Sequence, residues 1–135
     1  MAKQSGLGLA VFSVDDSAGT VKDLRNDIGN FGISTPRAVQ DVTGLDVSAN
    51  ERILLLADFS LDTAVFFNPA VGRSHDVFKT VSSTSVARTT TITMGGVTLA
   101  AELLFTDYGL TRADGGAVSI KAPGVLANGV VPTWA

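Results

Sequence analysis

The clearest pattern in the chain is an alternation of apolar and polar residues over two neighbouring runs, Val86 to Met94 and Val97 to Thr106. A period of two is typical of a β-strand with one buried face. Gly95-Gly96 separates the runs, and two such glycines favour a tight hairpin turn because both can adopt positive φ. The sequence therefore predicts an antiparallel hairpin in which Met94 pairs with Val97.

This register sorts the hairpin side chains onto two faces. The face expected to point into the core is mostly apolar and carries Val86, Arg88, Thr90, Ile92, Met94, Val97, Leu99, Ala101, Leu103 and Phe105. The opposite face is small, hydroxylated and weakly acidic, and carries Ala87, Thr89, Thr91, Thr93, Thr98, Ala100, Glu102, Leu104 and Thr106.

A second alternating run extends from Ile53 to Asn68, longer than the usual strand of about 5 to 6 residues. One side is apolar, whereas the other holds Asp58, Ser60 and Asp62 in its middle and apolar residues at its ends. We expect one long strand that projects beyond a simple sandwich or crosses a large sheet. Its middle is expected to be a solvated acidic stripe.

Two segments beside this run carry helix signals. Ser48-Ala49-Asn50-Glu51 has the spacing of a capping box and predicts a short helical turn. Asn68-Pro69 offers an N-cap and a proline at the first helical position, and Val71, His75 and Phe78 follow at helical spacing. We therefore expect the one substantial helix over residues 69–80.

Further strands are expected at residues 9–14, 20–33 with interruptions, 38–43, 117–122 and 125–131, because Gly-, Asp- and Asn-containing turns separate these segments. No repeat, linker or low-complexity tract divides the chain, and 135 residues suit one core. The sequence thus predicts a mainly β protein with one flanking helix and a single domain over residues 1–135.

Composition and charge exclude several classes of protein. With 45% apolar and 17% charged residues the chain should fold rather than stay disordered. A formal charge of −3 offers no basic stripe for tight binding of nucleic acid. The apolar run Ile53 to Ala57 is far shorter than the roughly 20 residues that span a bilayer, so no membrane insertion is expected. The first residues lack the apolar segment of an export signal, which predicts a protein that stays where it is made.

Residues that could carry catalysis or bind a metal are few. Ser74-His75-Asp76 has the residues of a hydrolase triad, but neighbours on a helix point about 100° apart and cannot hydrogen-bond in series. One histidine and no cysteine make a poor transition-metal site. Asp58 and Asp62 would lie roughly 13 Å apart along a strand, too far for a catalytic carboxylate pair. We expect no enzyme, no cofactor and no metal.

Segments along nearly the whole chain also resemble, in order, the major tail tube proteins of long-tailed (siphovirus-type) actinobacterial bacteriophages. These segments are Asp23 to Gly29, Ser34 to Gly44, Ser48 to Arg52, Phe67 to Ala70, Ser74 to Phe78, Leu104 to Tyr108, Arg112 to Gly115 and Pro132 to Ala135. The resemblance implies a tail tube-type β-sandwich or barrel with a flanking helix. It also implies hexameric rings that stack into a tube for DNA delivery.

The resemblance implies no catalytic residues. It implies a place in the virion tail after synthesis in the host cytoplasm, and contacts with the tape measure protein and other tail proteins. DNA would pass through the lumen without specific binding. Joining the sheets of six subunits into one barrel would also remove exposed strand edges, which otherwise promote aggregation.

Two sets of residues are candidates for this role. A lumen through which DNA slides should avoid cationic side chains, which bind phosphate, and the candidates to face it are Asp58, Ser60, Asp62, Thr89, Thr91 and Glu102. The apolar ends of the long strand are expected to meet other subunits, and the candidate subunit or ring contacts are Phe66, Phe67, His75, Phe78 and Trp134.

Two alternatives stay open. The chain could be another β-sandwich interaction module, such as a head-to-tail connector or a carbohydrate- or protein-binding domain. It could also be an enzyme whose site the sequence patterns do not reveal. Discrete monomers would favour the module, whereas rings or tubes would favour the tail tube.

Overall fold

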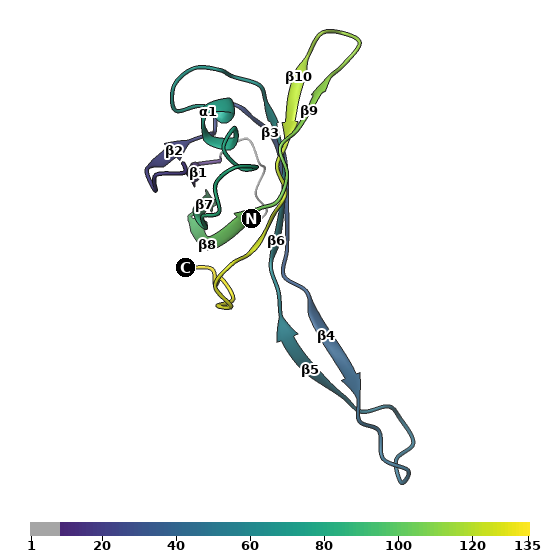
Figure 1. The fold of residues 1–135 in the computed structure, drawn as a ribbon. Helices are drawn as coiled ribbons and strands as arrows, with labels where there is room; N and C mark the ends of the chain where they lie inside the picture. The colour runs from purple at the N-terminus through teal and green to yellow at the C-terminus, as the bar shows by residue number, and fades with distance from the viewer. Residues whose placement is uncertain (1–8) are drawn as a thin grey trace.

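The computed structural model describes residues 9–135 (Figure 1). Residues 1–8, on which the expectation about an export signal rests, lie outside the described residues. This part of the chain is mainly β, as predicted, with one short helix, α1 (Ser74–Phe78). Its strands are β1 (Val11–Asp15), β2 (Val21–Asp23), β3 (Ile28–Ser34), β4 (Arg37–Asp41), β5 (Arg52–Ala57), β6 (Ser60–Phe66), β7 (Arg88–Met94), β8 (Val97–Phe105), β9 (Gly109–Arg112), β10 (Val118–Lys121) and β11 (Gly124–Leu126).

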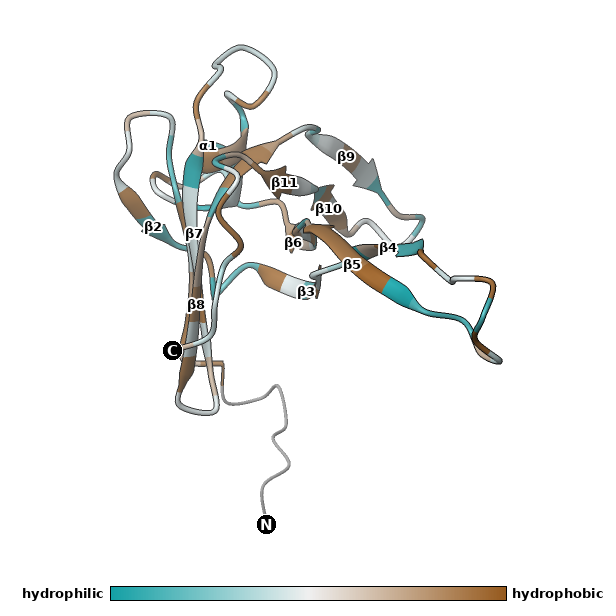
Figure 2. Cartoon of the chain, turned by 90° about the horizontal axis from the view of Figure 1, so that it is seen from below, coloured by the Kyte–Doolittle hydropathy of each residue, from teal (hydrophilic) through white to brown (hydrophobic). Residues whose placement is uncertain are grey.

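Nine strands form one curled sheet with two walls. Strands β2, β1, β7 and β8 make the first wall, and strands β3, β6, β10 and β9 make the second wall. Strand β11 joins them, because it pairs with β8 on one side and with β6 on the other. Figure 2 shows β7 and β8 edge-on, with the second wall extending away from them. The core lies between the walls.

The predicted hairpin is confirmed as β7 and β8. Met94 pairs with Val97 and Arg88 pairs with Leu103, which is the register expected from the alternation. Gly95 and Gly96 both have positive φ, 61° and 84°, so the turn uses the freedom that only glycine has at no cost.

The core combines side chains from both walls and from α1. Phe12 of β1 lies 5.2 Å from Phe31 of β3 between ring centroids, which brings the two walls together. Phe78 of α1 meets Phe105 of β8 edge to face, also at 5.2 Å. Arg88 is buried as well, and its guanidinium donates to the carbonyl of Val77 and to the hydroxyl of Thr80. The helix therefore closes one end of the core.

The expectation of one long strand over residues 53–68 is wrong. The structure has two strands there, β5 and β6, separated by Asp58 and Phe59. The Phe59 amide donates to the Asp58 carboxylate at 2.8 Å, and the Asp58 amide donates to the Pro36 carbonyl at 2.9 Å. Because these bonds take the place of a regular ladder, β5 leaves the large sheet and pairs with β4 in a separate two-stranded sheet.

The helix over residues 69–80 is also shorter than predicted, since α1 contains only Ser74–Phe78. Gly72 has a φ of 76°, which a right-handed helix cannot include. The Asn68 side chain accepts from the amide of Ala70 at 3.1 Å and so forms a turn instead of a helix cap. Local turn chemistry therefore delays the start of the helix by five residues, from residue 69 to Ser74.

Three smaller expectations differ from the structure. The helical turn at Ser48-Ala49-Asn50-Glu51 is absent, because the Glu51 amide donates to the Thr43 hydroxyl at 2.9 Å and closes the loop between β4 and β5. The strand expected over residues 125–131 is reduced to β11. Strand β9 was not expected at all.

Candidate assembly interface

The hairpin of β4 and β5, residues 37–57, extends away from the core and is called the arm below (Figure 1). Leu54 is 58% exposed and Leu56 is 92% exposed. The four consecutive apolar residues Ile53 to Leu56 place apolar side chains on both faces of the arm, because side chains alternate along a strand. Large apolar patches on a protein surface mark interaction sites. Both faces of the arm therefore have the character of an interface.

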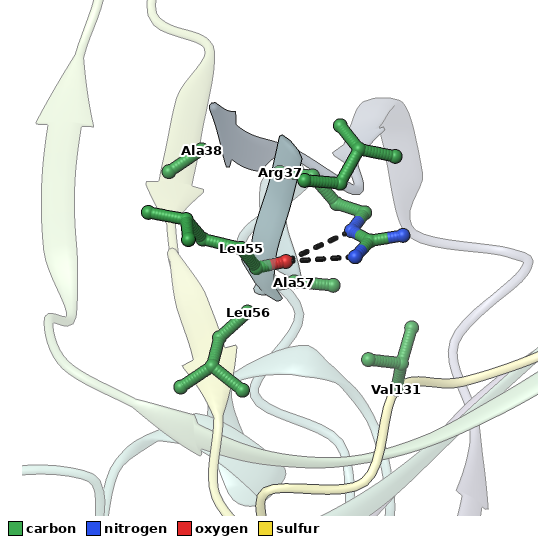
Figure 3. A pocket seen from close by; sticks show the side chains of 7 residues that line it. Arg37, Ala38, Leu55, Leu56, Ala57 and Val131 are labelled. Atoms are coloured by element: carbon green, nitrogen blue, oxygen red, sulfur yellow. Dashed lines mark hydrogen bonds between the residues drawn. The ribbon is translucent and has the colours of Figure 1, made fainter. Parts of the chain in front are cut away.

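An open groove of about 1000 Å³ lies at the base of the arm (Figure 3). Its lining is mainly apolar and comes from Ala38 of β4, residues 54–57 of β5 and Val131. Arg37 is the charged residue of this lining, and its Nε and Nη2 atoms donate to the Leu55 carbonyl at 3.0 and 2.8 Å. These bonds hold the guanidinium against the arm, so the groove offers an ordered apolar surface.

The second wall ends in two free strand edges. Within residues 9–135, β3 pairs only with β6, and β9 pairs only with β10. Every pairing across this wall is antiparallel, so β3 and β9 run in opposite directions. Unpaired edges present amide and carbonyl groups that can pair with a strand of another chain.

Three of the candidate lumen residues lie at the second wall. Ser60 and Asp62 are on the face of β6 that points away from the core, since Leu61 between them and Thr63 after them are buried. Asp58 is exposed in the link between β5 and β6. The same outer face carries other small or polar residues of β6 and of the neighbouring strands: Asn30, Gly32, Ser34, Ala64, Thr111, Ser119 and Lys121.

The other three candidate lumen residues lie on the outer face of the first wall. Thr89 donates through its hydroxyl to the Glu102 carboxylate, and Thr91 sits opposite Ala100. The C-terminal segment runs beside them, because the Ala127 amide donates to the Glu102 carbonyl at 2.9 Å. The structure therefore divides the six candidates between two walls.

Asp15 at the end of β1 stands beside Thr89 and Glu102. Burial, and then the negative charge of Glu102, raise the pKa of Asp15 above its usual range. One carboxylate oxygen of Asp15 is buried and has no hydrogen-bond partner within residues 9–135. A raised carboxyl pKa means that the folded protein binds the proton more tightly than the unfolded chain. Asp15 therefore favours folding at low pH, and this contribution is lost as the pH rises through the raised pKa.

We expect Asp15→Asn to raise the melting temperature at pH 7, because the amide removes the partly buried negative charge next to Glu102. The gain should vanish below about pH 4, where the aspartic acid is itself neutral. Asp16→Asn is the matched control and should lower the melting temperature at pH 7. The amide of Thr20 donates to the Asp16 carboxylate and lowers its pKa, so the ionised form is the one that stabilises the fold. Thermal melts of the three proteins at both pH values test this, and a uniform gain for Asp15→Asn at every pH would contradict it.

The candidate contact residues differ in accessibility. Phe66 is 54% exposed on the outer face of the second wall, and Trp134 is 50% exposed in the C-terminal segment. Phe67 packs against His75 at 4.9 Å between centroids with the rings tilted by 45°, and both are half-buried. Phe78 is 0% exposed, so its assignment as a contact residue is corrected to a core role.

Ser74, His75 and Asp76 each have a different partner, as their spacing predicts. The Ser74 hydroxyl donates to the Phe66 carbonyl at 2.6 Å. His75 Nδ1 lies 2.6 Å from the Tyr108 hydroxyl. Asp76 accepts from the backbone amide at position 72. The three side chains therefore serve the packing of α1 and do not form a triad.

Residues 9–135 hold no cluster of three or more His, Cys, Asp or Glu side chains that could bind a metal ion. None of the helices in this part of the chain has the length and apolar character needed to cross a bilayer.

The sequence patterns did not indicate Leu110 of β9 as a candidate contact residue, because β9 is short and its alternation is weak. An isolated leucine between Gly109 and Thr111 was the available signal.

Two solved structures are similar to this chain over nearly its whole length. One comes from the virion of a native gene transfer agent particle, with a TM-score of 0.76 and 15% identity over 98% of this chain and 99% of that chain. The other comes from the tail of an empty gene transfer agent particle with C6 symmetry, with a TM-score of 0.75 and 18% identity over 98% and 99%. No protein-family model and no curated protein matches the chain. At these identities the likeness shows a shared fold.

Proposed function

We propose that this chain is a structural tail subunit that self-assembles into hexameric rings, which stack into the tube that delivers phage DNA. The main support for this proposal is that the arm exposes apolar side chains on both of its faces in the single chain. The shared fold with a component of a C6-symmetric tail supports the ring. Within this proposal the chain works in the virion tail, without catalysis or a cofactor, beside the tape measure protein and other tail proteins.

The free edges of the second wall support the ring. Rotation about a tube axis keeps the direction of each strand along that axis, so β9 of one copy would meet β3 of the next in antiparallel orientation. Four strands from each copy would then join into one closed barrel. Closure pairs every edge of this wall, which is how barrels avoid uncontrolled aggregation.

The arm supports the stacking of rings. It leaves the second wall at one end and continues beyond it in roughly the direction of β3 and β6 (Figure 1). An extension along the strands would reach past its own ring to the next one. Burial of leucines there would contribute about 1.5 to 3 kcal/mol for each side chain, repeated at every subunit of the tube.

Closure of the barrel through the second wall would place the outer face of that wall at the lumen. Asp62 on this face and Asp58 in the link at its end outnumber Lys121, the one cation on the outer face of the described strands. A net acidic surface does not retain the phosphate backbone. The Thr89, Thr91 and Glu102 group would then face away from the lumen.

We expect Asp62→Lys to slow DNA ejection from assembled particles in a salt-dependent way, because each ring would present a set of new phosphate-binding lysines to the DNA. Glu102→Lys, the same charge reversal on the other wall, should leave ejection unchanged. Ejection rates measured at two salt concentrations separate the two variants. Equal effects of both substitutions would contradict the assignment of the lumen.

The oligomeric state tests the proposed function against the alternative of a discrete interaction module. Native mass spectrometry of the purified chain should give hexamers or their multiples. A protein that stays monomeric at concentrations well above micromolar would overturn the proposal and favour the module.

A further inference from the structure

A second apolar groove, of about 640 Å³, opens between the free strand β3 and the first wall. Its apolar lining comes from β3, β7 and the C-terminal segment, and includes Ile28, Phe31, Ile33, Ile92, Met94 and Trp134. The groove lies directly behind the free edge of β3. Within residues 9–135, no strand covers this edge.

Leu110 on β9 is an apolar side chain that residues 9–135 leave largely uncovered. It pairs with Ile120, which is fully buried, so its side chain is on the core side of the second wall. Leu110 is nevertheless 54% exposed, because β9 is the last strand of that wall. Its neighbour Thr111 points to the opposite face.

We propose that the groove beside β3 is the docking site for Leu110 of a second copy of this chain. The inference rests on the proposed ring and specifies how neighbouring subunits recognise each other. When β9 of one copy extends the sheet at β3 of the next, side chains on the core side of β9 lie beside those on the core side of β3. On β3 these are Ile28, Phe31 and Ile33, which line the groove.

The register across one subunit indicates where the leucine would enter. Leu110 is level with Ile28, through the pairs Leu110 with Ile120, Ile120 with Val65 and Val65 with Ile28. Strands in a closed barrel are tilted against the barrel axis, and this tilt shifts the register between strands of neighbouring subunits. The contact is therefore sought along the whole of β3 in the experiment.

The chain has no cysteine, so introduced cysteines report contacts without background. We would combine Leu110→Cys in turn with Ile28→Cys, Phe31→Cys and Ile33→Cys, and oxidise the assembled protein. Side chains facing each other across antiparallel strands have Cβ atoms about 4.5 to 5.5 Å apart, near the separation of about 3.5 to 4.5 Å in a disulfide. At least one pair should give a ladder of covalent multimers on a non-reducing gel.

The matched control replaces Leu110→Cys by Thr111→Cys in the same three combinations, and these should give no ladder because the side chain is on the other face. Rings without any ladder in the Leu110 series, or with equal ladders in both series, would overturn the inference and leave the proposed function standing. Failure of the unmodified chain to form rings would overturn both.

Leu110→Asp gives a second measurement that does not depend on oxidation. Because Leu110 is exposed in the single chain, the melting temperature of the monomer should stay within about 2 °C of the parent, as for a surface substitution. Ring formation should be lost. Thr111→Asp, with the same charge one residue away, should keep its rings. Rings from Leu110→Asp would contradict the proposed contact.

Discussion

Replacement of Leu56 by aspartate is expected to abolish tube formation while the monomer folds as before. Leu56 is 92% exposed in the arm, so the single chain loses almost no packing. In a tube the substitution removes the burial of a leucine, about 2 kcal/mol, and places a charge in an apolar contact. The lost burial alone raises the critical concentration roughly 30-fold, and the buried charge adds to this. Sedimentation across a concentration series measures the effect.

Gln40→Asp is the control for this experiment. Gln40 is a polar, exposed residue of the same arm and pairs with Ile53. It receives the same charge without the loss of an apolar side chain, so its tubes should form near the parent concentration. Tubes from Leu56→Asp at the parent concentration would show that this side of the arm is not an interface.

Replacement of Phe78 by alanine is expected to have the largest effect on folding. Phe78 is fully buried and packs edge to face on Phe105. Loss of such a side chain costs about 3 to 5 kcal/mol, a large part of the 5 to 15 kcal/mol or so that stabilises a domain. The melting temperature should fall by on the order of 10 °C or more. Calorimetry of the monomer at low concentration measures the shift.

Phe66→Ala makes the same chemical change at a position that is 54% exposed. It should cost the monomer less than about 1 kcal/mol, in line with other surface substitutions. A loss as large as that of Phe78→Ala would contradict the placement of Phe66 at the surface.

The β7–β8 hairpin could be predicted from sequence down to its register. Its Gly-Gly turn and its alternation are local signals that agree with each other, and the buried face leaves one acceptable pairing. The length of α1 could not be predicted in the same way. The positive φ of Gly72 outweighs the helical spacing of Val71, His75 and Phe78, and the sequence does not reveal which effect is stronger.

Long-range hydrogen bonds explain other differences. Asp27 is buried and accepts from the Asn68 side chain at 3.0 Å and from the Ser74 amide at 3.2 Å. These bonds join residues more than forty positions apart and fix where α1 begins. No pattern along the chain indicates such a contact, because it depends on the pairing of β3 with β6.

The candidate interface was predicted in part. Alternation correctly placed Ser60 and Asp62 on an outward face, because successive residues of β6 point to opposite faces and this depends only on their order along the strand. It could not divide the six candidate lumen residues between two walls, because that division depends on how the sheet curls. The apolar ends of the long run suggested contacts with other subunits, but the arm itself required the break at Asp58, which the alternation hides.

A cryo-electron microscopy reconstruction of the assembled protein would show directly which strands line the channel. The proposed arrangement requires a sixfold tube whose lumen is lined by β3, β6, β10 and β9, with Ser60 and Asp62 facing the channel and β7 and β8 on the outside. Discrete monomers under all assembly conditions, or a tube with β7 and β8 lining the channel, would contradict it.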